Sequence, residues 1–530
     1  MTLSMNSKLD ISLIIIFLGS VFITSEKFIN TINSPKFYFT IVALLILLVV
    51  IFLKNNDFAT IFQFTNSFTL LRGIYIIGVF QSIYGILQFI GKCSSNHSSF
   101  NVTGSFENPA GFVTVLSLIF PVGLYWCLKS KLLEQRLVFF SLGLILFSIV
   151  ISGSRTGILA IIAPSIVFLV FEFQLLLKIR NLKNSFQIYF LGIVILLSSL
   201  FFLYKSKSDS ANGRVLIWNV TAEMIKEKPL FGFGFKGFKA NYMNYQARYF
   251  ELIPQSEFKY LADNVAHPFN EFLNIIVCFG IIGLLLYLSL LSFVIWKCFK
   301  LDYLQKNILL CCFTSFIVLS FFSYPLQYIP VWFFLGYLIL ILFSTSIRNV
   351  KINLFARILA VAACILGTII FALKINDELK WKEIAIKSLE GATIKMLPNY
   401  AYLYPKMIDN ELFLYNYGAE LNIAEKYPES NRILLECSNN FNNYDLQMIV
   451  ADNYYQTGKT EKAIQTYQHA SYMIPCRFLP SYQIFQIYKN ANHKTLATKY
   501  ANEIINKKVK IPSIAVNSMK EEAQEYLQEN

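Results

Sequence analysis

Long apolar runs dominate this chain and limit the folds that are open to it. A helix needs roughly 17–25 residues to cross the ~30 Å hydrocarbon core of a bilayer. Of the 530 residues, 55% are hydrophobic and 15% are charged, a composition that would leave large apolar patches on a soluble protein. The chain is therefore predicted to be an all-α, polytopic membrane protein. About eleven spans are expected, at 11–25, 37–53, 70–90, 109–128, 137–152, 157–177, 186–204, 270–296, 307–323, 328–346 and 355–373.

Basic residues predict the orientation of these spans. With the N-terminus in the cytoplasm, the short loops on that side carry 15 Lys and Arg, and the short outer loops carry four. Cytoplasmic loops are enriched in basic residues, so a cytoplasmic N-terminus is expected. The long loop 205–269 and, after the eleventh span, the C-terminal tail then lie on the outer face. An error of one helix in the count would move the tail to the other side.

The net charge of +14 belongs to the membrane part of the chain. Residues 1–373 hold 28 basic and 14 acidic residues, whereas the remainder holds 18 of each. Loop lysines that set the topology explain this excess, so no nucleic-acid partner is implied. Membrane lipids are the expected contact of this basic surface.

The soluble tail predicts a helical repeat. Residues 445–475 form two short amphipathic patterns around Gly458, and their order of small residues, tyrosines and proline resembles a tetratricopeptide (TPR) repeat of 34 residues. The expected organisation is a transmembrane domain over 1–373, a linker over 374–410 and a TPR-like domain over 411–530. Such a surface binds a protein partner or presents an acceptor; a plain helical cap is an equal alternative.

Two short motifs on the predicted outer face begin membrane helices. In "FNVTGSFENPAGFVTV" (100–115), Asn108 and Pro109 have the pattern of a helix start, and the free amides there form a weak anion site. In "ISGSRTGILA" (151–160), Arg155 lies in a tight turn without a neighbouring acid. A guanidinium so placed suits a phosphate, with contact to lipid headgroups as the alternative.

The long loop supplies two further motifs. In "NGRVLIWNVTAEMIKEKPLFGFGFKGF" (212–238), an amphipathic helix on the membrane surface is expected, with Trp218 at the interface and Arg214 near its start. In "AHPFNEF" (266–272), His267 stands at the entrance of a span and is followed by Asn270 and Glu271. A histidine there is a candidate general base for a hydroxyl, and the other two can orient it or a sugar. A structural histidine is the alternative.

Other chemistries have little support in the sequence. It contains no HExxH, no GxSxG and no cysteine–histidine spacing typical of a metal site, so no metal or cofactor is expected. Carboxylates are nearly absent from the predicted spans, whereas ion-coupled pumps generally need them there.

In this order, the four motifs over roughly 70–345 resemble the O-antigen ligase superfamily, which includes Wzy-like polymerases and bacterial protein O-oligosaccharyltransferases. The resemblance implies a metal-independent, GT-C-like glycosyltransferase that moves a glycan from undecaprenyl pyrophosphate to an acceptor hydroxyl. It also implies that Arg155 and Arg214 match the pyrophosphate-binding arginines of the family, and that His267 matches its base or acceptor-positioning histidine. The sequence here reads His-Pro-Phe-Asn-Glu, where members often have His-x-His-Asn.

Three functions remain open at this point. The first is a ligase that acts on lipid A core or on a protein, and the second is a polymerase of glycan repeat units. In a deletion strain, loss of a ligase leaves long lipid-linked chains, whereas loss of a polymerase leaves single units. The third is a transporter or an envelope scaffold that recruits partners through the tail, for which glycan transfer would persist without Arg155, Arg214 and His267.

Overall fold

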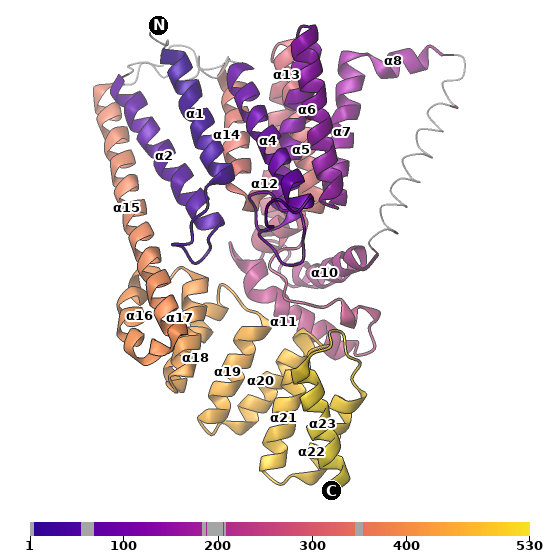
Figure 1. The fold of residues 1–530 in the computed structure, drawn as a ribbon, viewed down its shortest axis with the longest axis vertical. Coiled ribbons are helices and arrows are strands. Elements are labelled where there is room, and N and C mark those ends of the chain that lie inside the picture. Colours follow the sequence, from indigo (N-terminus) through magenta and orange to yellow (C-terminus); the bar gives the residue numbers. More distant parts are fainter. Residues whose placement is uncertain are drawn as a thin grey trace. The chain divides into compact units, whose positions relative to one another are not determined.

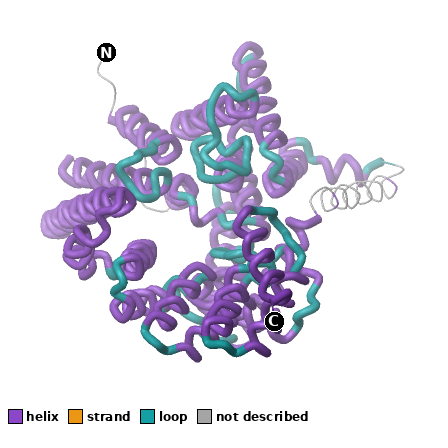
Figure 2. The backbone as a smooth tube through the Cα atoms, turned by 60° about the horizontal axis from the view of Figure 1, so that its bottom comes forward, coloured by secondary structure: helices purple, strands orange, loops and turns teal. Residues whose placement is uncertain are grey.

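The computed structural model describes residues 5–54, 68–182, 208–344 and 353–529, together with the single positions 187 and 205. Within these ranges the regular structure is helical, and no strand occurs (Figure 2). The expected all-α class is therefore confirmed. Contacts divide the chain into two units, which are taken one at a time below. The first unit contains residues 1–203, 269–271 and 286–382, and the second contains 204–268, 272–285 and 383–530.

Among the described residues, eight helices are long and apolar enough to cross a membrane, which confirms a multi-pass membrane protein. Two shorter or less apolar helices, α1 (Met5–Phe22) and α14 (Ile329–Ser344), occupy two more of the predicted spans. The predicted span 186–204 lies outside the described residues. The eight are α2 (Asn33–Lys54), α4 (Phe68–Phe89), α5 (Pro109–Lys129), α6 (Leu132–Ile151), α7 (Arg155–Glu172), α12 (Glu271–Cys298), α13 (Tyr303–Phe322) and the helix that begins at Leu354, α15 (Leu354–Lys387).

Helix α5 forms the centre of the first unit, with α4, α6, α7 and α13 packed around it (Figure 1). Buried hydroxyls join three of these helices. Ser315 Oγ donates to the carbonyls of Ser117 and Ala160, each at 2.9 Å, and Ser117 Oγ donates to the Gly157 carbonyl at 3.4 Å. Small residues and hydroxyls of this kind allow membrane helices to approach closely.

Two helix ends differ from the expected boundaries. Helix α7 ends at Glu172, several residues early, because Gln174 takes a left-handed backbone (φ 50°) before the short helix α8 (Leu175–Arg180). Helix α15 continues to Lys387, and a turn with Gly391 at φ 93° leads into α16 (Thr393–Met407). Most of the segment 374–410, expected as a linker, is therefore helical.

Helical hairpins build most of the second unit. The first helices of three successive hairpins begin at intervals of 33 and 35 residues, and Gly458 makes a turn at φ 75°. The predicted helix–turn–helix at 445–475 is confirmed, and the repeated alanines Ala463 and Ala497 are fully buried. The TPR assignment itself stays a prediction. The helices are α17 (Glu411–Ile423), α18 (Tyr427–Ser438), α19 (Tyr444–Gln456), α20 (Thr460–Met473), α21 (Leu479–Asn490), α22 (Lys494–Asn506) and α23 (Ile514–Glu529).

The long loop belongs to the same unit as the tail. It forms α10 (Ser208–Glu227), α11 (Gly237–Leu252) and the short turn η2 (Glu257–Tyr260), and α11 packs against α20. The fully buried Gln246 bonds both parts, since its Nε2 donates to the Met473 carbonyl at 2.7 Å and to the Asp263 carbonyl at 3.2 Å. Loop and tail therefore lie on the same side of the membrane, and the side itself remains a prediction.

Candidate functional site

Three of the four sequence motifs meet at one turn of the first unit, residues 322–328. Thr156 Oγ1, next to Arg155, donates to the Phe322 carbonyl at 3.2 Å. The buried Glu271 accepts the Leu326 amide at 3.0 Å, and Asn108 accepts the Tyr328 hydroxyl at 3.0 Å. Motifs that lie far apart in the sequence are thus fastened to the same short segment between α13 and α14.

Asn108 is the N-cap of α5, as its sequence context predicted. Its backbone is extended (φ −151°), its Oδ1 accepts the Gly111 amide at 3.2 Å, and Pro109 opens the helix. The same oxygen also accepts the Tyr328 hydroxyl. Asn108 therefore contributes to the structure of the turn, and its role in substrate binding stays a prediction.

Aromatic rings continue the connection between these motifs. Ring centroids lie 5.8 Å apart for Phe106 and Tyr328, 5.7 Å for Tyr328 and Tyr324, and 5.3 Å for Tyr324 and Phe269. The row thus connects the motif of Asn108 with the motif of Asn270, which is half-buried directly after Phe269. Packed rings of this kind hold the polar groups between them in fixed positions.

Lys36 is a charged residue whose position the sequence did not reveal. Counted only as a loop lysine, it is 1% exposed within α2, where its Nζ donates to the Ser105 carbonyl and lies 4.1 Å from the Phe106 ring centroid. Its place just before a long apolar run was the available signal. A buried lysine needs such partners, so Lys36 fixes the loop that leads to Asn108.

Arg155 is the first residue of α7. Gly153 turns the chain at φ 67°, Ser154 caps the helix by accepting the Gly157 amide at 3.3 Å, and Arg155 is half-buried. A cation at the positive end of a helix dipole is unfavourable by some tenths of a kcal/mol unless an anion is bound nearby.

The second unit brings Arg214, Trp218 and the His267 segment together. The Trp218 indole Nε1 donates to the Pro268 carbonyl at 2.9 Å, which ties α10 to the residue after His267. Arg214 precedes Trp218 by four positions and therefore lies on the same face of α10, one turn away. The sequence placed Trp218 at the membrane interface, and the structure adds this bond to the candidate base segment.

His267 is half-buried in the loop before α12. Partial burial, together with the nearby positive charge of Lys239, lowers the pKa of His267 to about 4. The imidazole is therefore uncharged near neutral pH and able to accept a proton. An ion pair with the tail holds Lys239 in position, since its ammonium lies 3.6 Å from the carboxylate of Glu411 at the start of α17. The same carboxylate also pairs with Lys236 at 2.7 Å.

The tail holds the segment just before His267, in what we call the Asn264 clamp (Asn264, Tyr444 and Asp445). Asn264 Nδ2 donates to Asp445 Oδ2 at 2.9 Å, and the Tyr444 amide donates to Asn264 Oδ1 at 3.1 Å. Both tail residues open helix α19. Nothing in the sequence indicated this clamp, because helical periodicity carries no information on a contact between residues 180 positions apart.

The glycine-rich end of the third motif fills a break in α12. Gly280 has φ 67° and ψ −169°, which interrupts the helix. The Phe233 and Gly234 amides donate to the carbonyls of Val277 and Cys278 at 2.8 Å each, and the Ile281 amide donates to the Pro229 carbonyl at 2.8 Å. Backbone N–H and C=O groups in an apolar setting must form hydrogen bonds. The segment 229–234 (PLFGFG) supplies these bonds and so stabilises the break in α12.

Gly280→Ala is expected to destabilise the protein by about 3 kcal/mol or more, because an added Cβ would lie 2.0 Å from the Leu230 carbonyl oxygen and the residue has a positive φ. The midpoint of thermal unfolding of the detergent-solubilised protein measures this. Gly143→Ala in α6 is the matched control, since its Cβ would meet nothing within 4 Å. Equal midpoints for the two variants would contradict the account of the break.

The sequence is similar to those of known proteins. Residues 140–288 match the family described as O-antigen ligase. The chain is 27% identical over 152 residues to a Rickettsia conorii protein named as a polysaccharide ligase. The aligned segment covers 27% of this chain and 34% of that protein. It is 25% identical over 325 residues to a ComP-specific O-oligosaccharyltransferase of Acinetobacter baylyi, covering 58% and 57% of the two chains.

The chain thus spans about a third and a little over half of the lengths of these relatives. The matched family region contains Arg155, Arg214 and His267 together. With the multi-pass helical fold and the four motifs in order, these matches support one assignment: residues 140–288 form a region similar to the O-antigen ligase family.

Proposed function

We propose that this protein transfers a glycan from undecaprenyl pyrophosphate to an acceptor hydroxyl at the periplasmic face of a bacterial inner membrane. The observation that carries the proposal is the family match over 140–288, which includes both arginines and the candidate base. The glycan-transfer names of the two relatives support it. Because the polyprenyl tail stays in lipid, the donor pyrophosphate has to be bound close to the membrane.

In the proposed reaction, the acceptor oxygen forms a bond to the anomeric carbon of the donor glycan while the bond from that carbon to the pyrophosphate oxygen breaks. The hydroxyl proton passes to His267, and the electron pair of the broken bond leaves with undecaprenyl pyrophosphate. Guanidinium groups bind phosphate oxygens bidentately, so Arg214 stabilises the charge that grows on the leaving group. Arg155 is the second predicted cation, a role that the start of α7 suits once an anion is bound.

Donor binding strengthens the base in this scheme. With a pKa of about 4, His267 is by itself a weak proton acceptor. The negative charges of a bound pyrophosphate favour the imidazolium and so raise that pKa toward neutrality. Proton transfer is thereby coupled to the presence of the donor.

A reconstituted assay tests the proposal. Purified protein in detergent or nanodiscs is mixed with undecaprenyl-pyrophosphate-linked glycan and, in separate reactions, with lipid A core, a Ser/Thr-containing acceptor protein or a second lipid-linked glycan. A glycosylated lipid A core or protein supports a ligase or an oligosaccharyltransferase. Extension of the second lipid-linked glycan identifies the polymerase instead, and the absence of transfer to every acceptor contradicts the proposal.

The Asn264 clamp gives a prediction for the tail. Asp445→Ala removes one of its hydrogen bonds and is expected to lower the turnover of the assay about tenfold, because the segment that carries His267 loses a fixed position. The exposed Glu461, also an acid near the start of a tail helix, provides the control variant Glu461→Ala. If both variants keep full turnover, the clamp has no role in the reaction.

A further inference from the structure

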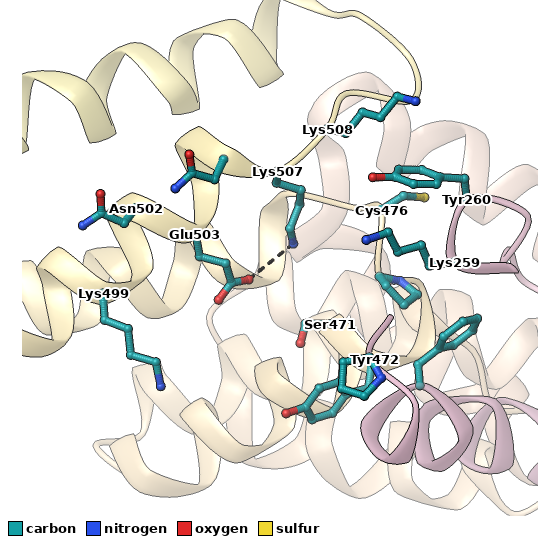
Figure 3. A pocket seen from close by; sticks show the side chains of 14 residues that line it. Lys259, Tyr260, Ser471, Tyr472, Cys476, Lys499, Asn502, Glu503, Lys507 and Lys508 are labelled. Atoms are coloured by element: carbon teal, nitrogen blue, oxygen red, sulfur yellow. Dashed lines mark ion pairs between the residues drawn. The ribbon is translucent and has the colours of Figure 1, made fainter. Parts of the chain in front are cut away.

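A cleft of about 580 Å³ lies in the second unit, between the end of the long loop and the last hairpins of the tail (Figure 3). The loop contributes Lys259 and Tyr260, and the tail contributes Tyr472 from α20 and Lys499 from α22, with Lys508 just beyond that helix. Its volume falls in the range of small-ligand sites. None of these residues belongs to the site proposed above.

Positive charge is concentrated around this cleft. Four lysines line it against a single carboxylate, Glu503. Lys507 is part of the wall, since its side chain is 14% exposed, pairs with Glu503 at 3.5 Å and donates to the Arg477 carbonyl at 3.1 Å. Lys507 and Glu503 thus balance one another, and three positive charges remain.

The three remaining lysines are Lys259, Lys499 and Lys508. Lys259 and Lys508 lie 5.3 Å and 5.4 Å from the Tyr260 ring centroid. Across the described part of the chain, no carboxylate is within ion-pair distance of any of the three. Burial lowers the pKa of Lys507, and the positive charge of Lys259 adds to that effect, so these two ammonium groups lie close enough to repel one another. A bound anion relieves this repulsion.

The remaining surface of the cleft suits a sugar. Tyr472 contributes a ring whose negative face attracts the C–H groups of a pyranose, whereas the Tyr260 ring already has the Lys259 and Lys508 ammonium groups over it. Asn502 and Asn506 carry carboxamides, which both donate and accept hydrogen bonds as sugar hydroxyls do. We propose that this cleft binds a negatively charged stretch of oligosaccharide, with carboxylate or phosphate groups beside these lysines and a sugar ring against Tyr472.

An acidic peptide is the competing ligand, and the cleft suits it less well. An added peptide strand needs an exposed strand edge, and the described residues of this unit contain no strand. A bound helix needs a continuous apolar groove, which four lysines and two asparagines interrupt. The inference rests on the proposed function, because it gives the second unit the task of holding the glycan or a glycan-bearing acceptor.

Binding to the full-length protein in nanodiscs tests the cleft. The probes are a fluorescent tetragalacturonate, which is an acidic oligosaccharide, neutral maltotetraose and a hepta-glutamate peptide. The triple variant Lys259→Gln, Lys499→Gln, Lys508→Gln is compared with Lys494→Gln, an exposed lysine on the same helix as Lys499 but outside the cleft. We expect the wild type to bind tetragalacturonate, the triple variant to lose at least tenfold in affinity, and Lys494→Gln to match the wild type.

Three results would overturn the proposal: no binding of tetragalacturonate, equal binding by the triple variant, or binding of hepta-glutamate as tight as that of the sugar. The transfer assay assigns the source of the anionic glycan, since the triple variant raises the KM for the donor if the donor chain binds here and the KM for the acceptor otherwise. The two proposals fail separately. Binding by wild-type protein that transfers no glycan contradicts the proposed function alone, and transfer without such binding contradicts the cleft alone.

Discussion

Arg214→Ala is expected to reduce glycan transfer by a hundredfold to a thousandfold while the protein still inserts and folds. Loss of one preorganised donor to a developing oxyanion has an effect of that size. Arg214 lies one helical turn from Trp218, whose indole donates to the Pro268 carbonyl, so the helix that carries Arg214 is bonded to the segment of the candidate base. Initial rates of transfer by purified protein measure the effect, with size-exclusion chromatography to check the fold.

Arg214→Lys and Arg248→Ala make the expectation specific. Lysine keeps the charge but loses the bidentate fork, so Arg214→Lys is expected to retain an intermediate rate. Arg248 is an exposed arginine of the same unit, with 68% of its side chain accessible and a 3.9 Å approach to Glu227. Full activity in Arg214→Ala, or an equal loss in Arg248→Ala, would remove the pyrophosphate role from Arg214.

His267→Ala is expected to lower kcat by a hundredfold or more, the usual contribution of a positioned general base. The pH profile separates this role from a structural one. Since protonation removes the base, kcat/KM of the wild type is expected to stay level from pH 8 to about 5 and to fall toward the pKa of His267 in the free protein, about 4. The fall in kcat is expected at higher pH, because bound pyrophosphate raises the same pKa.

His267→Gln is the matched variant for this test, because it keeps a hydrogen-bonding side chain that does not titrate. The residual activity of His267→Gln is expected to show no fall at acidic pH. If the variant keeps both the wild-type rate and the fall at acidic pH, another group is the base. If it loses activity together with the unfolding transition of the native protein, His267 serves the fold instead.

The sequence was informative wherever one pattern repeats locally. Apolar runs predicted the membrane helices, the Asn108–Pro109 pair predicted the start of α5, and the spacing around Gly458 predicted α19 and α20. Each of these signals arises within one helix or between neighbours in the chain, and each depends on backbone capping or helical periodicity.

The connections between motifs could not be predicted in the same way. The turn at 322–328 lies far from Asn108 and Thr156 in the sequence. Its tyrosines had no other visible role in the sequence than to mark the ends of predicted spans. Lys36 was taken for a surface charge because nothing local shows that Ser105 and Phe106 cover it. Gly280 lies in an apolar run where glycine is common, so the sequence did not reveal its positive φ or the hydrogen bonds that Phe233 and Gly234 make next to it.

The most direct test of the account measures both products of a single turnover. Excess purified protein is mixed with donor and acceptor, and free undecaprenyl pyrophosphate and glycosylated acceptor are quantified from the same quenched samples. We predict that the two appear together in a one-to-one ratio in the wild type and in Arg248→Ala, and that neither appears at a comparable rate in Arg214→Ala or His267→Ala. Wild-type rates of both products in these two variants would contradict the central claim.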